Sequence, residues 1–226
     1  IPRFLHGSWG ALAVITAINL KVLPKPKADV TFVHHETSLE DSLRSQRELL
    51  RQHPGIAAAV SEKTGDGWAL TVRLLGRRAS VDAQIRSFKD DLGSDTETSE
   101  GTALWESYTG RWAAADGHAV LLIGGRSGTL EGLATQIAEL AGVEHLAFSL
   151  GTGSLRMAMN PQTISREEIV ARLDEHQVTW VIESAPANWR GEGSVWGPER
   201  EDRALAASIK GQFDPANILN RGRLFI

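Results

Sequence analysis

Apolar positions along the chain form short runs that follow one another in the same order twice. Runs rich in β-branched residues alternate with stretches whose apolar residues recur every three or four positions, the spacing of one helix face. In the first half we expect the order strand, helix, strand, strand, helix. The expected strands are Asp29–His35, Gly55–Glu62 and Trp68–Leu75. The expected helices follow the capping box Thr37-x-x-Glu40, to about Gln52, and span Ser80–Leu92. Gly-Asp-Gly between its two later strands is typical of a hairpin turn.

The second half repeats this order and adds a closing strand. Its expected elements are His118–Ile123, the helix Gly128–Gly142, the hairpin strands Glu144–Leu150 and Ser154–Met159, the helix Arg166–His176 capped by Ser165, and Val178–Ile182. Residues 28–92 and 117–183 are therefore predicted to be two copies of a β-α-β-β-α unit, the split β-α-β pattern. The predicted fold class is α+β, with one antiparallel sheet built from two ferredoxin-like units and backed by helices.

Both ends of the chain differ from this repeat. Gly10–Leu23 is apolar and β-branched and predicts a strand covered on both faces, which Pro24-Lys-Pro26 ends at a domain boundary. The acidic, polar stretch Gly93–Gly101 predicts a mobile loop between the two halves, and a last helix is expected at about Glu199–Gln212. The predicted domains are 1–26, 27–198 and 199–226, the last returning to the first.

Composition narrows the functional classes. The 226 residues include 24 Lys+Arg and 28 Asp+Glu, so the net charge is −4 and lacks the basic footprint of a nucleic-acid-binding protein. The absence of cysteine excludes disulfides, a thiolate nucleophile, cysteine-bound zinc and iron–sulfur clusters held by this chain. Because no apolar run approaches about 20 residues and the start does not resemble a signal peptide, we expect a soluble, cytoplasmic chain without a membrane span.

Candidate catalytic patterns are weak. The seven histidines show no metal-ligand spacing, so no metal site is expected. Gly124–Gly128 lacks the Gly-Lys-Ser/Thr ending of a phosphate loop and is interpreted as a tight turn with Ser127 as helix N-cap. No Gly-x-Ser-x-Gly elbow supports a serine nucleophile, and no catalytic base can be assigned. Trp189 and Trp196, in a glycine-rich stretch, could cover a ligand, contact another domain or pack on their own sheet.

The two ends carry the most specific motifs. Residues 3–16 read R-F-L-H-G-S-W-G-A-L-A-V-I-T, residues 19–24 read N-L-K-V-L-P, and residues 210–223 read K-G-Q-F-D-P-A-N-I-L-N-R-G-R. This combination resembles the vanillyl-alcohol oxidase / p-cresol methylhydroxylase superfamily, with its G-S-x-G-x-L-G-V-I-T, L-K-V-L-P and K-x-x-F-D-P-x-x-I-L-N-P-G-R motifs. With Ala185-Pro186 and Val195-Trp-Gly-Pro198, it is most similar to the branch of glycolate oxidase E subunits.

The resemblance implies an FAD site on the matching residues. Those cofactor-binding candidates are Gly7, Ser8, Gly10, Ala11, Val14, Ile15, Thr16 and Asn220. Small residues in such a turn let a backbone approach a cofactor closely. The chain departs from the family pattern where Ala13 replaces a glycine, Ala17 an acidic residue and Arg221 a proline.

The resemblance further implies an FAD-linked oxidoreductase subunit that acts on glycolate or another small 2-hydroxy acid. Its partners would be a flavoprotein subunit and an iron–sulfur subunit, through which a cytoplasmic protein could lie peripheral to the inner membrane. The family's glycine-rich diphosphate loop precedes the matched segment, and the chain starts at Ile1. We therefore expect an N-terminally truncated chain that holds FAD weakly or not at all. A non-catalytic assembly or electron-relay subunit that docks such partners is the alternative.

Overall fold

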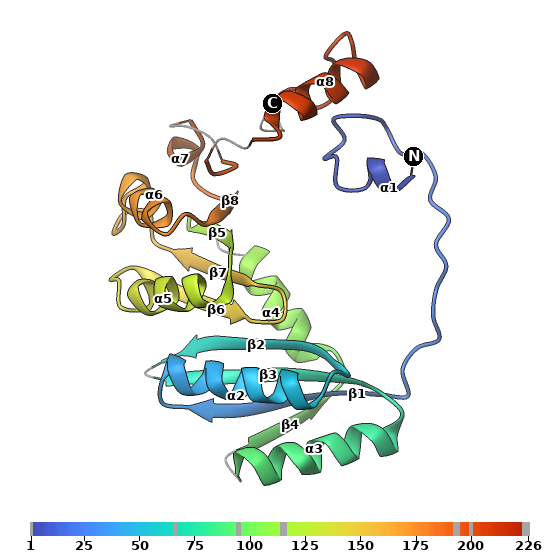
Figure 1. The fold of residues 1–226 in the computed structure, drawn as a ribbon, viewed down its shortest axis with the longest axis vertical. Helices are drawn as coiled ribbons and strands as arrows, with labels where there is room; N and C mark the ends of the chain where they lie inside the picture. Colours follow the sequence, from blue (N-terminus) through green and yellow to red (C-terminus); the bar gives the residue numbers. More distant parts are fainter. Residues whose placement is uncertain are drawn as a thin grey trace. The chain divides into compact units, whose positions relative to one another are not determined.

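The structure is a computed structural model that describes residues 2–65, 67–93, 96–113, 117–191, 195–198 and 201–222. It divides into two compact units (Figure 1). Ile1–Pro24 and Ser194–Ile226 form the first, which we call the terminal unit, and Lys25–Gly193 forms the second, the sheet unit. The two ends of the sequence thus belong to one body.

The sheet unit is built on one antiparallel sheet. Its described strands are β1 (Ala28–Glu36), β2 (Ile56–Thr64), β3 (Gly67–Gly76), β4 (Thr96–Glu100), β5 (Ala119–Gly124), β6 (Val143–Ser149), β7 (Ser154–Met159) and β8 (Thr179–Ser184). Their order is β4-β1-β3-β2-β6-β7-β5-β8. The second four strands repeat the connectivity of the first four in reverse spatial order, so both halves have the 4-1-3-2 order of a ferredoxin-like unit. The α+β prediction is confirmed, and the strand order agrees with two ferredoxin-like units.

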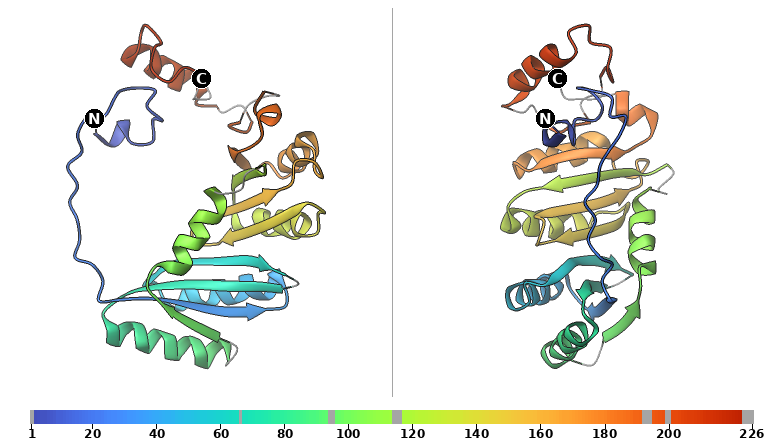
Figure 2. Two further views of the ribbon diagram at one scale, coloured as in Figure 1. Left: turned by 180° about the vertical axis from the view of Figure 1, so that it is seen from behind. Right: turned by 90° about the vertical axis from the view of Figure 1, so that its right-hand side faces the viewer.

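Helices cover the sheet on both faces. The unit's helices are α2 (Leu39–Gln52), α3 (Arg78–Leu92), α4 (Ala103–Ala113), α5 (Ser127–Ala138), α6 (Arg166–Glu175) and α7 (Ala187–Gly191). Successive side chains of a strand point to opposite faces of a sheet, so two neighbouring residues of β2 show which helices lie on which face. Ala59 belongs to the core under α2 and α3, where Phe32 and Phe88 stack edge to face at 5.3 Å. Val60 packs instead with Trp112 of α4, which lies on the other face (Figure 2).

The terminal unit has little regular structure. It contains α1 (Pro2–Leu5) and α8 (Arg203–Phe213), whose Phe4 and Phe213 rings lie 5.5 Å apart. Ala11 is almost fully buried, whereas α8 has no buried residue. No helix in the described ranges is long and apolar enough to cross a bilayer.

Three local predictions are wrong. The predicted mobile loop 93–101 contains the edge strand β4, which pairs with β1 through Thr98 and Phe32, although residues 94 and 95 lie outside the described residues. An edge strand with an exposed face needs no apolar residues, so its TETSE sequence gave no hydrophobic pattern. The α2 cap is Ser38, which accepts a hydrogen bond from the Asp41 amide, instead of Thr37. The N-cap of α5 is Arg126, which makes no side-chain capping hydrogen bond, instead of the expected Ser127.

The predicted strand Gly10–Leu23 is also not formed. Residues 13–26 belong to no helix or strand, and most of the segment follows an extended course (Figure 1). Large apolar side chains there remain exposed, including Leu20 at 79% and Leu23 at 85%. β-Branched composition favours an extended backbone, but a strand needs a second strand to receive its hydrogen bonds. The predicted strand, covered on both faces, is therefore wrong in both its pairing and its burial.

Candidate functional site

A left-handed turn follows α1. The Ser8 amide donates to the Leu5 carbonyl at 3.2 Å, and the Ala11 amide donates to the Ser8 carbonyl at 2.9 Å. Three residues between these bonds, Gly7, Trp9 and Gly10, have positive φ values of 80°, 53° and 67°. Glycine adopts this region without a steric penalty, whereas Trp9 does so at a cost. Two glycines thus leave much of this turn's backbone uncovered, and Trp9 is the residue that adopts an unfavourable backbone conformation.

The C-terminal tail meets this turn directly. The Asn220 side-chain amide donates to the Trp9 carbonyl across 211 positions of sequence. A Cβ atom on Gly10 would lie only 2.7 Å from Asn220 Nδ2. Any larger residue at position 10 would therefore force the Asn220 side chain to move away from the turn. The positive φ of Gly10 independently disfavours any other residue there.

A network at the end of α8 fixes the tail upstream of Asn220. The Asp214 carboxylate accepts hydrogen bonds from the amides of Ile218 at 3.1 Å and Leu219 at 2.8 Å. Its neighbour Lys210 donates to it at 2.5 Å. The Lys210 hydrogen bond, with the two amides, lowers the pKa of Asp214 to about 2. The carboxylate is thus charged at all ordinary pH values.

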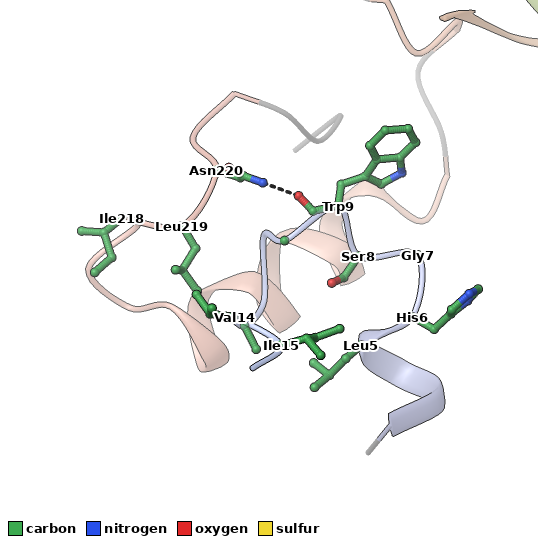
Figure 3. A pocket seen from close by; sticks show the side chains of 12 residues that line it. Leu5, His6, Gly7, Ser8, Trp9, Val14, Ile15, Ile218, Leu219 and Asn220 are labelled. Atoms are coloured by element: carbon green, nitrogen blue, oxygen red, sulfur yellow. Dashed lines mark hydrogen bonds between the residues drawn. The ribbon is translucent and has the colours of Figure 1, made fainter. Parts of the chain in front are cut away.

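Turn and tail line an open cavity of about 610 Å³ (Figure 3). Its lining residues come from both ends of the chain: Leu5, His6, Gly7, Ser8, Trp9, Gly10, Ala13, Val14, Ile15, Ile218, Leu219 and Asn220. Most of these side chains are apolar, and main-chain groups of the turn lie between them. No Lys, Arg, Asp or Glu is among them. Such a surface suits a flat heterocycle better than a charged group.

The structure brings most of the predicted FAD residues together. Gly7, Ser8, Gly10, Val14, Ile15 and Asn220 line this cavity. Ala11 lines an adjacent hollow of about 240 Å³ instead, together with Lys210 and Asp214. Thr16 lines neither of these two hollows and is exposed. Gly10 lies against the tail, so a larger residue there would first displace Asn220.

Several residues of the site were not predicted from the sequence. Trp9 and Leu219 line the cavity, and Lys210 and Asp214 hold its wall. The last two belong to the K-x-x-F-D-P motif, in which an acid follows a lysine by one helical turn. That i, i+4 spacing on a helix end was the available indication of an ion pair.

Trp189 and Trp196, which the sequence analysis considered together, lie in different units of the structure. Trp196 belongs to the terminal unit and stacks edge to face on Trp9 at 5.3 Å, beside the cavity. Trp189 belongs to α7 of the sheet unit and is only 3% exposed. The two rings therefore do not form one exposed apolar patch.

A second group of polar side chains lies between α4 and the sheet. Glu62 Oε1 of β2 and Arg111 of α4 are 2.7 Å apart. Burial raises the pKa of Glu62, and the charge of Arg111 opposes that rise. Burial likewise raises the pKa of Tyr108 and lowers that of His145. Arg156 of β7 pairs with Glu183 of β8 at 2.9 Å. Arg111 and Arg156 thus both have carboxylate partners, and these ion pairs stabilise the packing of α4 on the sheet.

The histidines lie in separate places. On the sheet unit, His34 is 3.0 Å from Glu36, His118 is 2.8 Å from Glu144, and His35 is 3.9 Å from Glu97. Within the described ranges, no three His, Asp or Glu side chains gather closely enough to hold a metal ion.

The glycine-rich turn 124–128 is a packing feature, because a Cβ on Gly124 would lie 2.9 Å from the Thr179 hydroxyl.

Comparison with known proteins gives a fold and no family. No family model matches the sequence, and no curated protein matches it. Chitooligosaccharide oxidase is similar in structure, with a TM-score of 0.51, 10% identity, and coverage of 86% of this chain and 54% of that one. The FgChi7B structure has a TM-score of 0.50, 11% identity, and coverage of 86% and 55%.

Glucooligosaccharide oxidase from Acremonium strictum, which carries a 6-S-cysteinyl, 8α-N1-histidyl FAD, reaches a TM-score of 0.48 at 8% identity, over 87% of this chain and 55% of that one. The chain thus spans about half the length of the solved structures it matches.

Proposed function

We propose that the chain is part of an FAD-dependent oxidoreductase and that the cavity of the terminal unit holds part of FAD. One observation carries this proposal: two motifs at opposite ends of the sequence form the walls of one cavity, joined by Asn220 and Trp9. These are the motifs that resemble the vanillyl-alcohol oxidase / p-cresol methylhydroxylase superfamily. The fold shared with chitooligosaccharide oxidase supports the same class.

The residues present fit one portion of FAD. Leu5, Val14 and Leu219 supply apolar walls that would exclude water from a ring. Because Gly10 has no side chain, Asn220 can reach the turn and bind the Trp9 carbonyl. Because the lining contains no Lys or Arg, the cavity suits the isoalloxazine or adenine ring and not the diphosphate. FAD, when bound, supplies the hydride acceptor, and this chain would bind and orient its ring.

Ligand titration tests the proposal. The exposed Trp9 lines the cavity, so ring binding should quench tryptophan fluorescence in the unmodified chain and less in Trp9→Phe. We expect weak binding, with a Kd of about 10 µM to 1 mM, because ring burial acts without ionic contacts. One of the two smaller ligands, riboflavin or adenosine, should bind with an affinity similar to that of FAD. Binding of riboflavin would place the isoalloxazine ring in the cavity, and binding of adenosine would place the adenine ring there.

Two glycine variants make the test specific. Gly10→Val should weaken binding by about tenfold or more, since its side chain would displace Asn220. Gly101→Val is the matched control, because Gly101 also has a positive φ of 87° but lies in the sheet unit with no atom near its Cβ position. Absence of binding, or equal affinity in Gly10→Val, would contradict the proposed site.

The finer proposal concerns substrate and assembly. We propose a subunit of a glycolate-oxidase type enzyme, close to its E subunit, that acts on a small 2-hydroxy acid. It would work with flavoprotein and iron–sulfur subunits, in the cytoplasm or peripheral to the inner membrane. The end motifs support this proposal. Its test is anaerobic flavin bleaching in the assembled enzyme, where glycolate should bleach the flavin and a simple sugar should not.

A non-catalytic assembly subunit is the second candidate. The exposed apolar side chains of the extended segment, among them Ile18, Leu20 and Val22, favour it, because such a run normally contacts another surface. Trp189 cannot contribute, since it is buried. Light scattering with candidate partner subunits decides: a stable complex of a chain that binds neither FAD nor riboflavin would favour assembly over catalysis.

A further inference from the structure

The amino group of Lys210 is fully engaged by three acceptors. Its Nζ atom lies 2.7 Å from the Ala11 carbonyl, 2.8 Å from the Leu219 carbonyl and 2.5 Å from Asp214 Oδ2. A protonated lysine has three N–H donors, so none is left for a further partner. The side chains of Lys210 and Asp214 are only 12% and 4% exposed. This ion pair therefore lies inside the terminal unit.

The pair holds both polar backbone groups of one cavity residue. The Leu219 amide donates to Asp214 at 2.8 Å, and the Leu219 carbonyl accepts from Lys210. Leu219 lines the cavity, and the next residue, Asn220, closes it on Trp9. Through Ala11, the same ammonium also holds the opposite segment, just after the left-handed turn. Lys210 thus fixes the distance between the two walls.

We infer that Lys210 and Asp214 are positioning residues for the ring of FAD that the cavity holds, an inference that rests on the proposed function. They hold Leu219 and Asn220 against the turn and do not touch the ligand. A lysine near a nucleotide site would ordinarily be assigned to a phosphate, but the saturated donors of Lys210 oppose that role. Its removal would leave the Ala11 and Leu219 carbonyls and a buried carboxylate without their shared donor, and the wall would loosen.

Paired variants of the whole 226-residue chain test this role. Lys210→Met keeps most of the length of the side chain and removes the charge and all three donors. Lys210→Arg keeps the charge, but a planar guanidinium cannot match three acceptors arranged around an ammonium. Lys63→Met is the matched control, because Lys63 also donates to a backbone carbonyl, that of Ala138, in the sheet unit. Each variant is titrated with FAD and with the phosphate-free ligand that the unmodified chain binds, riboflavin or adenosine, and amide exchange at Leu219 is followed by NMR.

The two ligands separate positioning from phosphate contact. We expect Lys210→Met to bind both about tenfold more weakly, Lys210→Arg to bind with intermediate affinity, and Lys63→Met to bind like the unmodified chain. Leu219 exchange should accelerate in Lys210→Met while the exchange of interior α8 amides does not change. Loss of FAD binding alone would make Lys210 a phosphate contact and overturn the inference, as would unchanged binding of both ligands.

The proposed function can fail separately. Should the unmodified chain bind neither ligand, the flavin proposal is overturned and the role of the pair toward flavin falls with it. The exchange measurement still decides whether the pair holds the wall, since unchanged Leu219 exchange in Lys210→Met would show that it does not.

Discussion

The side-chain amide of Gln46 in α2 donates to the backbone carbonyl of Phe148 in β6, 3.2 Å away. This bond crosses the junction of the two repeats, where β2 and β6 pair through only two residue pairs. The same amide donates to Ser61 of β2 at 2.9 Å, and the Gln46 side-chain oxygen accepts from the Leu150 amide at 2.6 Å. One fully buried glutamine thus compensates for a short strand pairing.

Gln46→Leu should destabilise the chain because it removes the buried hydrogen bonds to the Phe148 carbonyl and the Leu150 amide. We expect a loss of about 2–4 kcal/mol in the free energy of unfolding, measured in urea. Gln52→Leu is the control, since Gln52 lies in the same helix and its side chain bonds an exposed Glu48. The control should change stability by less than about 0.5 kcal/mol. Equal effects of the two substitutions would show that Gln46 does not hold the junction.

The repeat itself was predictable because its apolar pattern is strong. Leu39, Leu43 and Leu49 mark the buried face of α2, and Val30 and Phe32 belong to the core on the same face of the sheet. The cap was predicted one residue too early because Thr37 and Ser38 are both capping residues with an acid three positions later. Local sequence cannot choose between two adjacent caps of equal quality.

Other features depend on contacts that no local pattern encodes. The bond between Asn220 and Trp9 joins residues 211 positions apart, and only the family motifs suggested that they meet. Helix α4 did carry an apolar stripe, Trp105, Tyr108 and Trp112, but nothing in that stripe indicated the second face of the sheet. The segment after Gly10 has the composition of a strand, yet pairing depends on a partner elsewhere.

Gly10→Ala and Gly7→Ala should separate a clash from backbone strain. Both glycines have positive φ, so either alanine should destabilise the turn by about 1 kcal/mol. Only at Gly10 would the new Cβ meet Asn220 Nδ2, at 2.7 Å, whereas the Cβ position of Gly7 is open. We therefore expect loss of the Asn220 bond in Gly10→Ala alone, seen as a changed side-chain amide resonance in NMR. A changed resonance in both variants would assign the effect to strain.

Acid should release the tail only at very low pH. The Lys210 hydrogen bond holds the folded-state pKa of Asp214 at about 2, below the ordinary value of 3.8. A lowered carboxyl pKa contributes stability that is present above the unfolded-state value and is lost as pH falls toward 2. Leu219 amide protection, measured relative to an unprotected peptide at each pH, should thus persist at pH 4 and fall between pH 4 and 2. Asp214→Asn should remove this dependence, and a fall centred above pH 4 would contradict the assignment.

Glu62 should show the opposite dependence. Burial raises its folded-state pKa above 4.5, despite the opposing charge of Arg111. A raised pKa contributes stability that is fully present below the unfolded-state value and is lost as pH rises through the folded-state value. Relative to Glu62→Gln, which cannot ionise, the unmodified chain should therefore lose stability in urea unfolding as pH rises above about 4.5. Glu100→Gln is the control of opposite sign, because the Arg78 hydrogen bond lowers the pKa of Glu100. Parallel stability curves for the unmodified chain and Glu62→Gln would mean that Arg111 fully offsets the burial of the carboxylate.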